Sequence, residues 1–381
     1  MYYLMNKDRQ VALLRIVSGE YAPDKKLETI EIYDRLPLGV ANLNRWAESR
    51  RAYKHNKHLK QLVKKMGGDD IENYIRLTHL TSINDTFWVK QETESITWDD
   101  VSLYRNQFTE TISMIAFVGT SIKDFDFTPT SPELSCDGSF RKRFRKEKKL
   151  GEFGSDIFIY KRGGEVGAGI EPYCETLASE IANHISPDNS VSYSRRTPYN
   201  ILASRCNIFT NEKTGYISYA RVGDMDNLSL SDALRYFAKI GAEQKFLEMI
   251  VIDALCFNED RHAGNYGILF DNDTLEIQTM APVFDLNIAL FSNAVPEDFK
   301  HIGDYIHKIS PKLGNDFTEM GQFAANNATC RDRIKDMKDF TFSFRGDEIF
   351  SPERVKCLER IVQKQAAAIL SQDKLKTNIV F

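Results

Sequence analysis

The sequence predicts an α+β protein with a β-rich lobe followed by an α-helical lobe, preceded by an α-rich N-terminal unit. Helical periodicity dominates residues 42–108, glycines and prolines punctuate short apolar stretches from residue 125, and helical segments dominate beyond residue 228. A β-rich segment followed by an α-rich one is typical of a two-lobed fold with a cleft between the lobes. We therefore expect three units, with bounds 1–125, 126–222 and 223–381.

The N-terminal unit is predicted to contain helices and one short strand. Good helix formers with apolar residues near helical spacing predict helices at 42–66 and 71–80, and Phe87–Val89 predicts a strand. Another helix is expected to begin near Trp98, where acidic residues follow close to the positive end of the helix dipole. This unit carries no recognisable catalytic group.

Glycines and a single strongly apolar stretch mark the β-rich lobe, whereas long periodic segments mark the helical lobe. Strands are expected at 157–160, 207–210 and 216–220, with a turn at 211–215. The helices are expected at 172–185, 231–240, 243–257, 317–326 and 352–370.

Composition excludes several classes of protein. A hydrophobic share of 42% allows a substantial core and excludes disorder as the main state. The net charge of -4 argues against a surface built to neutralise nucleic-acid phosphates, so nucleic acid is not expected as a direct partner. The six cysteines are scattered and are expected to be reduced. Without an apolar stretch of about 18 residues, we expect a soluble, cytoplasmic protein with no membrane partner.

Residues 257–290 hold the strongest chemical signal. An apolar helix ends in a polar cluster that contains Asp260 and exceeds what a helix cap requires. Asn265 follows on the same loop, so a carboxylate can face an acceptor hydroxyl while an amide oxygen reaches a metal ion. Two strands, at 266–270 and 277–280, would then return the chain and deliver Asp285.

The alternative is a hairpin whose Asp and Asn residues merely form turns. We keep that reading for Asp271 and Asp273. For Asp260, Asn265 and Asp285 together, the order, spacing and apolar flanks favour phosphoryl transfer.

The motif DRHAGN followed by APVFDLN resembles the catalytic and metal-binding loops of HipA-like serine/threonine kinases, and more loosely those of phosphatidylinositol kinases. The resemblance, specific over residues 130–290, implies a bilobal protein-kinase-like fold that uses ATP and Mg²⁺. It implies a base at Asp260 and magnesium ligands at Asn265 and Asp285. Arg261 and His262 would orient the loop.

A kinase also needs a nucleotide-facing lysine on a strand and a carboxylate on a nearby helix. Lys161 ends the β-like run, and Glu171 and Glu175 lie at the start of the next helix. We leave open which glutamate is the partner, because the two lie one helical turn apart. The alternative for Lys161 alone is a solvated lysine at the end of a strand.

Two further nucleotide contacts follow from the resemblance. Residues 131–139 resemble the family's loop over the phosphates, with Gly138 and Ser139 at the nucleotide, although the segment lacks a G-x-G-x-x-G motif. The backbone of Ser218, Tyr219 and Ala220 would bind adenine as the hinge between the lobes; an ordinary strand pair is the alternative. The basic run 141–149 draws in a triphosphate or an acidic partner, or is a solvated charge run.

The sequence therefore predicts an ATP-dependent serine/threonine kinase that phosphorylates a protein substrate. Hydroxyls beside the expected phosphate loop, at Thr128, Ser135 and Ser139, are candidate autophosphorylation sites. A toxin role and an antitoxin partner are implied by the resemblance alone. The alternatives are a small-molecule or lipid kinase, or a nucleotide-binding pseudokinase; retention of the base and both metal ligands argues against the last.

Overall fold

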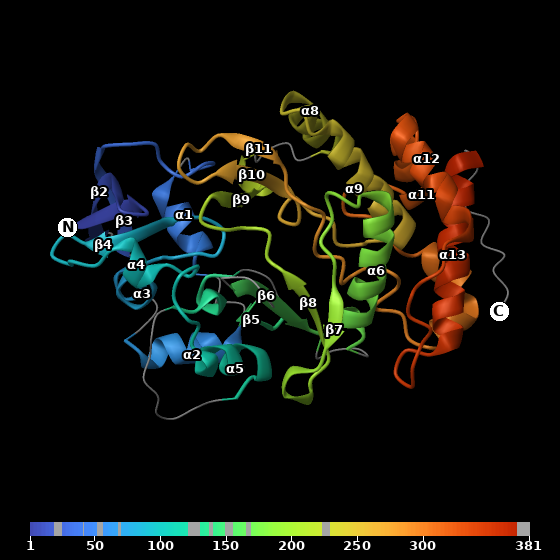
Figure 1. The fold of residues 1–381 in the computed structure, drawn as a ribbon, viewed down its shortest axis with the longest axis horizontal. Helices are drawn as coiled ribbons and strands as arrows, with labels where there is room; N and C mark the ends of the chain where they lie inside the picture. The colour runs from blue at the N-terminus through green and yellow to red at the C-terminus, as the bar shows by residue number, and fades with distance from the viewer. Residues whose placement is uncertain are drawn as a thin grey trace. The chain divides into compact units, whose positions relative to one another are not determined.

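The structure of the protein is a computed structural model. It describes residues 1–18, 25–40, 42–51, 56–67, 70–120, 130–136, 140–148, 155–164, 169–222 and 229–371. The chain divides into two compact units (Figure 1). Unit 1 comprises Met1–Lys161, Asn207–Ile217 and Leu269–Gln278, and unit 2 comprises Arg162–Cys206, Ser218–Ile268 and Thr279–Phe381.

Unit 1 begins with a four-stranded antiparallel sheet in the order β3-β2-β1-β4. Its strands are β1 (Tyr2–Asn6), β2 (Arg9–Ser18), β3 (Lys25–Ile32) and β4 (Phe87–Gln91). Ala12, Leu4 and Val89 pair across β2, β1 and β4, and all three are fully buried. Of these strands the sequence predicted only β4, so the α-rich N-terminal unit also contains a sheet.

Five helices accompany this sheet: α1 (Leu43–Ser49), α2 (Lys57–Lys65), α3 (Ile71–Thr78), α4 (Trp98–Val101) and α5 (Glu110–Val118). In place of one helix over 42–66, the structure has α1 and α2, with 52–55 outside the described residues. Arg50 explains why α1 ends where it does. Its buried guanidinium donates to the carbonyls of Leu80 and Phe87, at 2.8 and 3.0 Å.

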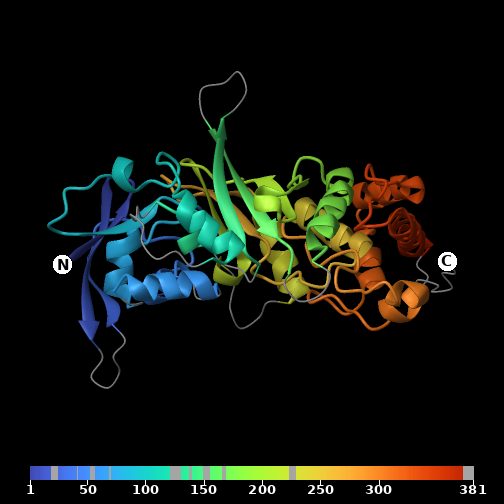
Figure 2. The same ribbon diagram turned by 90° about the horizontal axis from the view of Figure 1, so that it is seen from below.

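Two further β structures lie mainly in unit 1. The antiparallel pair β5 (Lys142–Lys148) and β6 (Ser155–Arg162) lies against α5, where Arg143 binds Glu110 at 2.9 Å (Figure 2). A three-stranded sheet has the order β11-β10-β9. Its strands are β9 (Thr214–Ser218), β10 (Gly267–Asp271) and β11 (Ile277–Met280).

The tip of the β10–β11 hairpin is bound by the N-terminal sheet. Asn6 Nδ2 donates to the carbonyl of Asn272 at 2.7 Å, and Lys7 Nζ lies 2.5 Å from the Asp273 carboxylate. Arg35 donates to the carbonyl of Thr274 at 3.0 Å. The hairpin tip therefore belongs to the same compact unit as the first strands of the chain.

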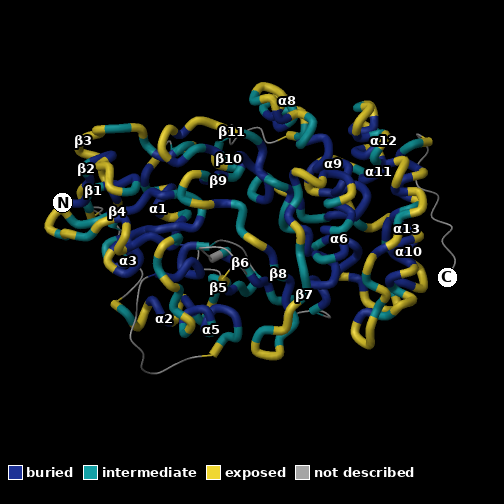
Figure 3. The backbone as a smooth tube through the Cα atoms, in the orientation of Figure 1, coloured by how far each residue is buried: buried dark blue, intermediate teal, exposed yellow. Residues whose placement is uncertain are grey.

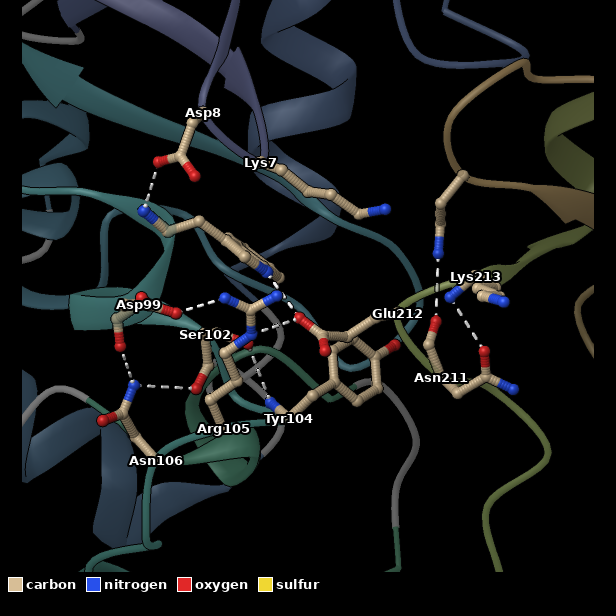
Figure 4. Close-up of polar contacts among 12 residues, drawn as sticks. Lys7, Asp8, Asp99, Ser102, Tyr104, Arg105, Asn106, Asn211, Glu212 and Lys213 are labelled. Carbon is tan, nitrogen blue, oxygen red and sulfur yellow. Dashed lines mark hydrogen bonds and ion pairs between the residues drawn. The ribbon is translucent and has the colours of Figure 1, made fainter.

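A polar cluster binds the turn before β9 to the start of α4 (Figure 4). Trp98 Nε1 and Arg105 Nε both donate to Glu212 Oε1, each at 2.7 Å. Arg105 also pairs with Asp99, and the Trp98 amide donates to Asp8 at 2.8 Å. The cluster joins three segments that are far apart in the sequence.

Unit 2 is mainly helical, and α9 (Glu243–Cys256) lies at its centre, packed by α6, α8, α11 and α13. The remaining helices are α6 (Glu171–Ile185), α7 (Tyr219–Val222), α8 (Leu230–Lys239), α10 (Ile302–Ile306), α11 (Phe317–Ala324), α12 (Ala328–Asp336) and α13 (Pro352–Ser371). Two short strands, β7 (Ser194–Arg196) and β8 (Ala203–Asn207), pair antiparallel. The sequence predicted α6, α8, α9, α11 and α13 to within a few residues.

The bounds 1–125, 126–222 and 223–381 stay a prediction. The compact units follow contacts instead, and they group α6 with the C-terminal helices. Across the part of the chain that the structure describes, no helix combines the length and the hydropathy that a membrane span requires.

Candidate functional site

The site is built where α9 ends. From Phe246 to Cys256 every residue of this helix is buried (Figure 3). Phe257 then takes a left-handed conformation, with φ 52°, and ends the helix. Asp253 is the acidic residue of the last helical turn, and it is fully buried. A buried carboxylate needs a counter-charge, and the loop after the helix supplies one.

Arg261 provides that charge and is itself fully buried. Its Nε and Nη2 donate to the two oxygens of Asp253 at 2.9 and 3.0 Å. Two parallel bonds of this kind fix both position and angle. Asn258 adds a third contact to the same carboxylate, at 2.8 Å. The ion pair raises the pKa of Arg261 against the opposing effect of its burial, so the guanidinium stays charged.

The remaining Arg261 contacts reach both loops of the site. Nη1 donates to the carbonyl of Asn265 and to the carbonyl of Phe284, each at 2.8 Å. One guanidinium therefore joins the DRHAGN loop to the residue before Asp285. This contact holds the two predicted loops side by side, and the orienting role of Arg261 in catalysis stays a prediction.

Asp260, next to the buried arginine, is partly exposed. Its side chain retains 30% of its accessible surface. The Asp260 amide donates to Asn258 Oδ1 at 3.2 Å, and its carbonyl accepts from Asn265 Nδ2 at 3.1 Å. Lys312 forms an ion pair with the Asp260 carboxylate. The backbone is held from two sides, whereas the carboxylate meets solvent, as a proton acceptor for an external hydroxyl requires.

Asn265 and Asp285 supply hard oxygen atoms. The Asn265 side chain donates through its nitrogen to Asp260, which orients the amide and makes Oδ1 the atom for a cation. Asp285 adopts a left-handed backbone, with φ 59°. Asp tolerates this region better than most residues, yet the conformation costs about 1 kcal/mol. Such local strain is typical of functional positions.

Asp285 is positioned by a half-buried tyrosine. Its amide donates to the Tyr193 hydroxyl at 3.3 Å, and burial is the main cause that raises the pKa of Tyr193 well above its ordinary value. The tyrosine therefore stays neutral. Just before Asp285, Val283 exchanges backbone hydrogen bonds with Asn189 and Val191, at 2.8 and 2.9 Å. The segment that leads to Asp285 is thus fixed against the residues after α6.

The residues fit a magnesium ion that also binds phosphate. Mg²⁺ is usually held by one or two protein oxygens together with substrate phosphates and water. Asn265 and Asp285 match this pattern. The described residues contain no group of three His, Cys, Asp or Glu side chains suited to a metal ion. That excludes an all-protein cage of these side chains within the described part of the chain.

His262 shapes the loop and is itself exposed. Its Nδ1 accepts from the Gly264 amide at 3.0 Å. A Cβ at Gly264 would lie 2.7 Å from the imidazole ring, so a larger residue there would displace the ring. The His262 carbonyl accepts from the Asn265 amide at 2.8 Å. His262 thus stabilises the turn between Asp260 and Asn265.

The two predicted glutamates lie buried in the first turns of α6. Glu175 accepts from the Ser204 hydroxyl. Glu171 Oε2 is buried and has no hydrogen-bond partner among the described residues. Such an oxygen is expected to have a cationic or hydrogen-bonding partner. Lys161 belongs to unit 1, where it ends the first segment, so its pairing with either glutamate stays a prediction.

The predicted hinge is occupied by contacts within unit 2. The amides of Tyr219 and Ala220 donate to the carbonyls of Tyr266 and Ala263, at 2.8 and 2.9 Å. The Tyr219 ring is buried and stacks on Tyr266, with centroids 5.4 Å apart. Adenine recognition at Ser218–Ala220 stays a prediction, and it would have to use backbone groups other than these two amides.

The predicted phosphate loop is only partly described. Gly138, Ser139 and Thr128 lie outside the described residues. Ser135 follows the 3-10 turn Pro132–Leu134 and is buried. Its hydroxyl donates to the carbonyl of Pro132 at 3.4 Å. Phosphorylation of Ser135 would therefore require the turn to open.

The sequence missed Asp253, Tyr193 and Lys312. Asp253 could have been found, because a single acid inside a strongly apolar helix implies a buried partner. Tyr193 and Lys312 have no local signal. Lys312 is separated from Asp260 by 52 residues, and its role depends on the tertiary fold.

Comparison with known proteins supports the fold. No protein-family model matches the sequence, and no curated protein sequence matches it. HipA, from the structure of the HipA, HipB and operator DNA complex of Shewanella oneidensis MR-1, aligns with a TM-score of 0.50 and 12% identity. The alignment covers 97% of this chain and 98% of that chain.

The proinflammatory kinase CtkA of Helicobacter pylori aligns with a TM-score of 0.46 and 17% identity, over 61% of this chain and 93% of that chain. The likeness to HipA spans nearly the whole chain, and at this identity it shows the fold alone. The predicted fold class, α+β and kinase-like, is confirmed.

Proposed function

We propose that this chain, which has a HipA-like kinase fold, is an ATP- and magnesium-dependent protein kinase that phosphorylates a Ser or Thr hydroxyl. One observation carries the proposal. Arg261 binds Asp253 and also the backbone of both loops that present Asp260, Asn265 and Asp285. A buried arginine is costly to place, so its use to join these loops indicates that their geometry matters.

Each residue has one task in this proposal. Asp260 accepts the proton of the substrate hydroxyl, whose oxygen then attacks the terminal phosphorus. Asn265 Oδ1 and the Asp285 carboxylate hold Mg²⁺, which neutralises charge on the phosphates. Arg261, His262 and Tyr193 keep the loops in place. Lys161 with Glu171 or Glu175 binds the nucleotide.

A partner protein is part of the proposal. The HipA structure that this fold resembles contains the second protein of its toxin–antitoxin system, HipB, with operator DNA. We infer that the chain is a toxin held inactive by an antitoxin. Expression of the chain alone should slow bacterial growth, and an Asp260→Asn variant should not. Equal growth inhibition by both proteins would contradict a toxin role that depends on kinase activity.

The enzymatic proposal is tested by phosphoryl transfer from labelled ATP to the chain itself and to protein, lipid and small-molecule acceptors. Asp260→Asn should lower the rate by about 10²- to 10⁴-fold, because it removes the base. Asp285→Asn keeps the left-handed backbone and should also abolish turnover. Glu276→Gln, an exposed residue of β10–β11, is the matched control and should retain full activity.

Binding of Mg-ATP separates the role of Asp260 as base from the role of Asp285 as magnesium ligand. Mg-ATP at 100 times its Kd should stabilise the native chain by about 2.7 kcal/mol. Asp260→Asn should keep this stabilisation, whereas Asp285→Asn should lose its magnesium-dependent part. Nucleotide binding without turnover in the natural chain would support the pseudokinase alternative, and transfer only to non-protein acceptors would support the small-molecule or lipid kinase.

A further inference from the structure

Lys312 is the positively charged residue that pairs with Asp260, the proposed base. It lies between α10 and α11, and its ammonium pairs with the Asp260 carboxylate. The lysine side chain is 57% exposed. An exposed ion pair by itself contributes little to folding. The pair is therefore better explained by what it does to the carboxylate than by stability.

The backbone at Lys312 is well anchored. Pro311 and Leu313, on either side, are both buried. Gly314 has φ 107°, and a Cβ there would lie 2.7 Å from Met320 Sδ. Asp316 then caps α11 by accepting from the amides of Thr318 and Glu319, at 2.8 and 3.0 Å. A packed turn thus delivers the lysine to Asp260.

The DRHAGN loop itself offers no cation to pair with the Asp260 carboxylate. Arg261 is fully buried and donates to Asp253 and to two backbone carbonyls. The His262 ring faces the Gly264 amide. A second acid lies beside the base: burial, followed by repulsion from Asp260, raises the pKa of Glu259. Lys312 therefore brings to Asp260 a positive charge that the loop itself does not supply.

We propose that Lys312 is the positioning residue of Asp260, on the premise of the function proposed above. Its ammonium holds the carboxylate toward the acceptor hydroxyl. In the reaction, the acceptor O–H bond breaks and its proton passes to Asp260. The acceptor oxygen bonds to the terminal phosphorus as the bond from phosphorus to the bridging oxygen breaks, and ADP leaves with that electron pair.

The test compares Lys312→Met, Lys312→Arg and the control Lys308→Met, an exposed lysine in the same segment. Lys312→Met should lower kcat by about 100-fold, the cost of a misplaced reacting group. The KM for ATP should stay within about twofold. Lys312→Arg keeps the charge and should recover most of the rate. Lys308→Met should match the natural chain.

A double-variant cycle shows whether the lysine acts through the base. Lys312→Met added to Asp260→Asn should cause no further loss of kcat. A further 100-fold loss would overturn the proposal. A higher rate in Lys312→Met would also overturn it, because the ion pair would then hold Asp260 in an inactive position. The urea midpoint should not change; a lower midpoint with equal losses in kcat and ATP binding would identify a purely structural residue.

The same phosphoryl-transfer assays distinguish the proposed kinase function from the proposed role of Lys312. If the natural chain transfers phosphate and Lys312→Met transfers it equally well, only the role of Lys312 fails. If the natural chain transfers phosphate to no acceptor, the proposed function fails and the role of Lys312 fails with it.

Discussion

Two polar networks fix loops in this molecule, and they differ in burial. In unit 2, the side chains of Arg261 and Asp253 are both 0% exposed. In unit 1, Arg105 and Glu212 are 45% and 32% exposed (Figure 4). Both networks join segments that are distant in sequence. Water screens the second and not the first, so the first can define the geometry of a site while the second mainly links surface turns.

The largest effect should come from removing one partner of the buried pair. Arg261→Met leaves Asp253 as a buried charge without compensation and should lower the free energy of unfolding by about 3–5 kcal/mol. Urea denaturation measures this. The double variant Arg261→Met with Asp253→Leu removes both charges and should regain much of the loss. If the single variant were as stable as the natural chain, the difference between the two networks would not hold.

An intermediate effect is expected at Glu212. The Trp98 indole is 1% exposed, and its N–H donates to Glu212. Glu212→Ala leaves this donor unpaired and should cost about 1 kcal/mol. Glu212→Gln keeps an acceptor oxygen and should cost less. A loss as large as that of Arg261→Met would contradict the difference between the buried and the exposed network. Urea denaturation measures this loss as well.

The smallest effect is expected at the hairpin tip. Lys7 and Asp273 form an ion pair in which the side chains are 24% and 56% exposed. Lys7→Ala should cost less than about 1 kcal/mol. Salt should reduce the difference from the natural chain, because the Debye length falls to about 3 Å at 1 M. A cost that salt does not change would indicate packing by the lysine stem instead.

The sequence marked the candidate residues of the site, whereas it did not mark the residues that hold them in place. Asp260, Asn265 and Asp285 lie within one short stretch, and their side-chain types and spacing express the chemical requirement directly. Tyr193 and Lys312 approach that stretch from elsewhere in the chain. No local pattern marks a residue whose function comes from tertiary contact.

The predicted helices and strands show the same difference between local patterns and tertiary contacts. Long amphipathic or apolar helices such as α9 were predicted because their periodicity is local. The first strands were missed, since β2 is an apolar run interrupted by Arg15 without clear alternation and its partner β3 is largely exposed. The end of α1 was missed because Arg50 is fixed by carbonyls of other segments.

The discontinuity of unit 1 limits how the protein can be shortened. Residues 207–217 and 269–278 belong with the N-terminal strands and helices rather than with the rest of the C-terminal half. Deleting residues 1–125 would strip the partners from Asn272 and Glu212 and expose Phe144 and Ile157, which pack in one cluster with Ile83 and Leu103. A trimmed version made to isolate the catalytic half should therefore be poorly soluble, and biochemical work on the site should retain the first strand.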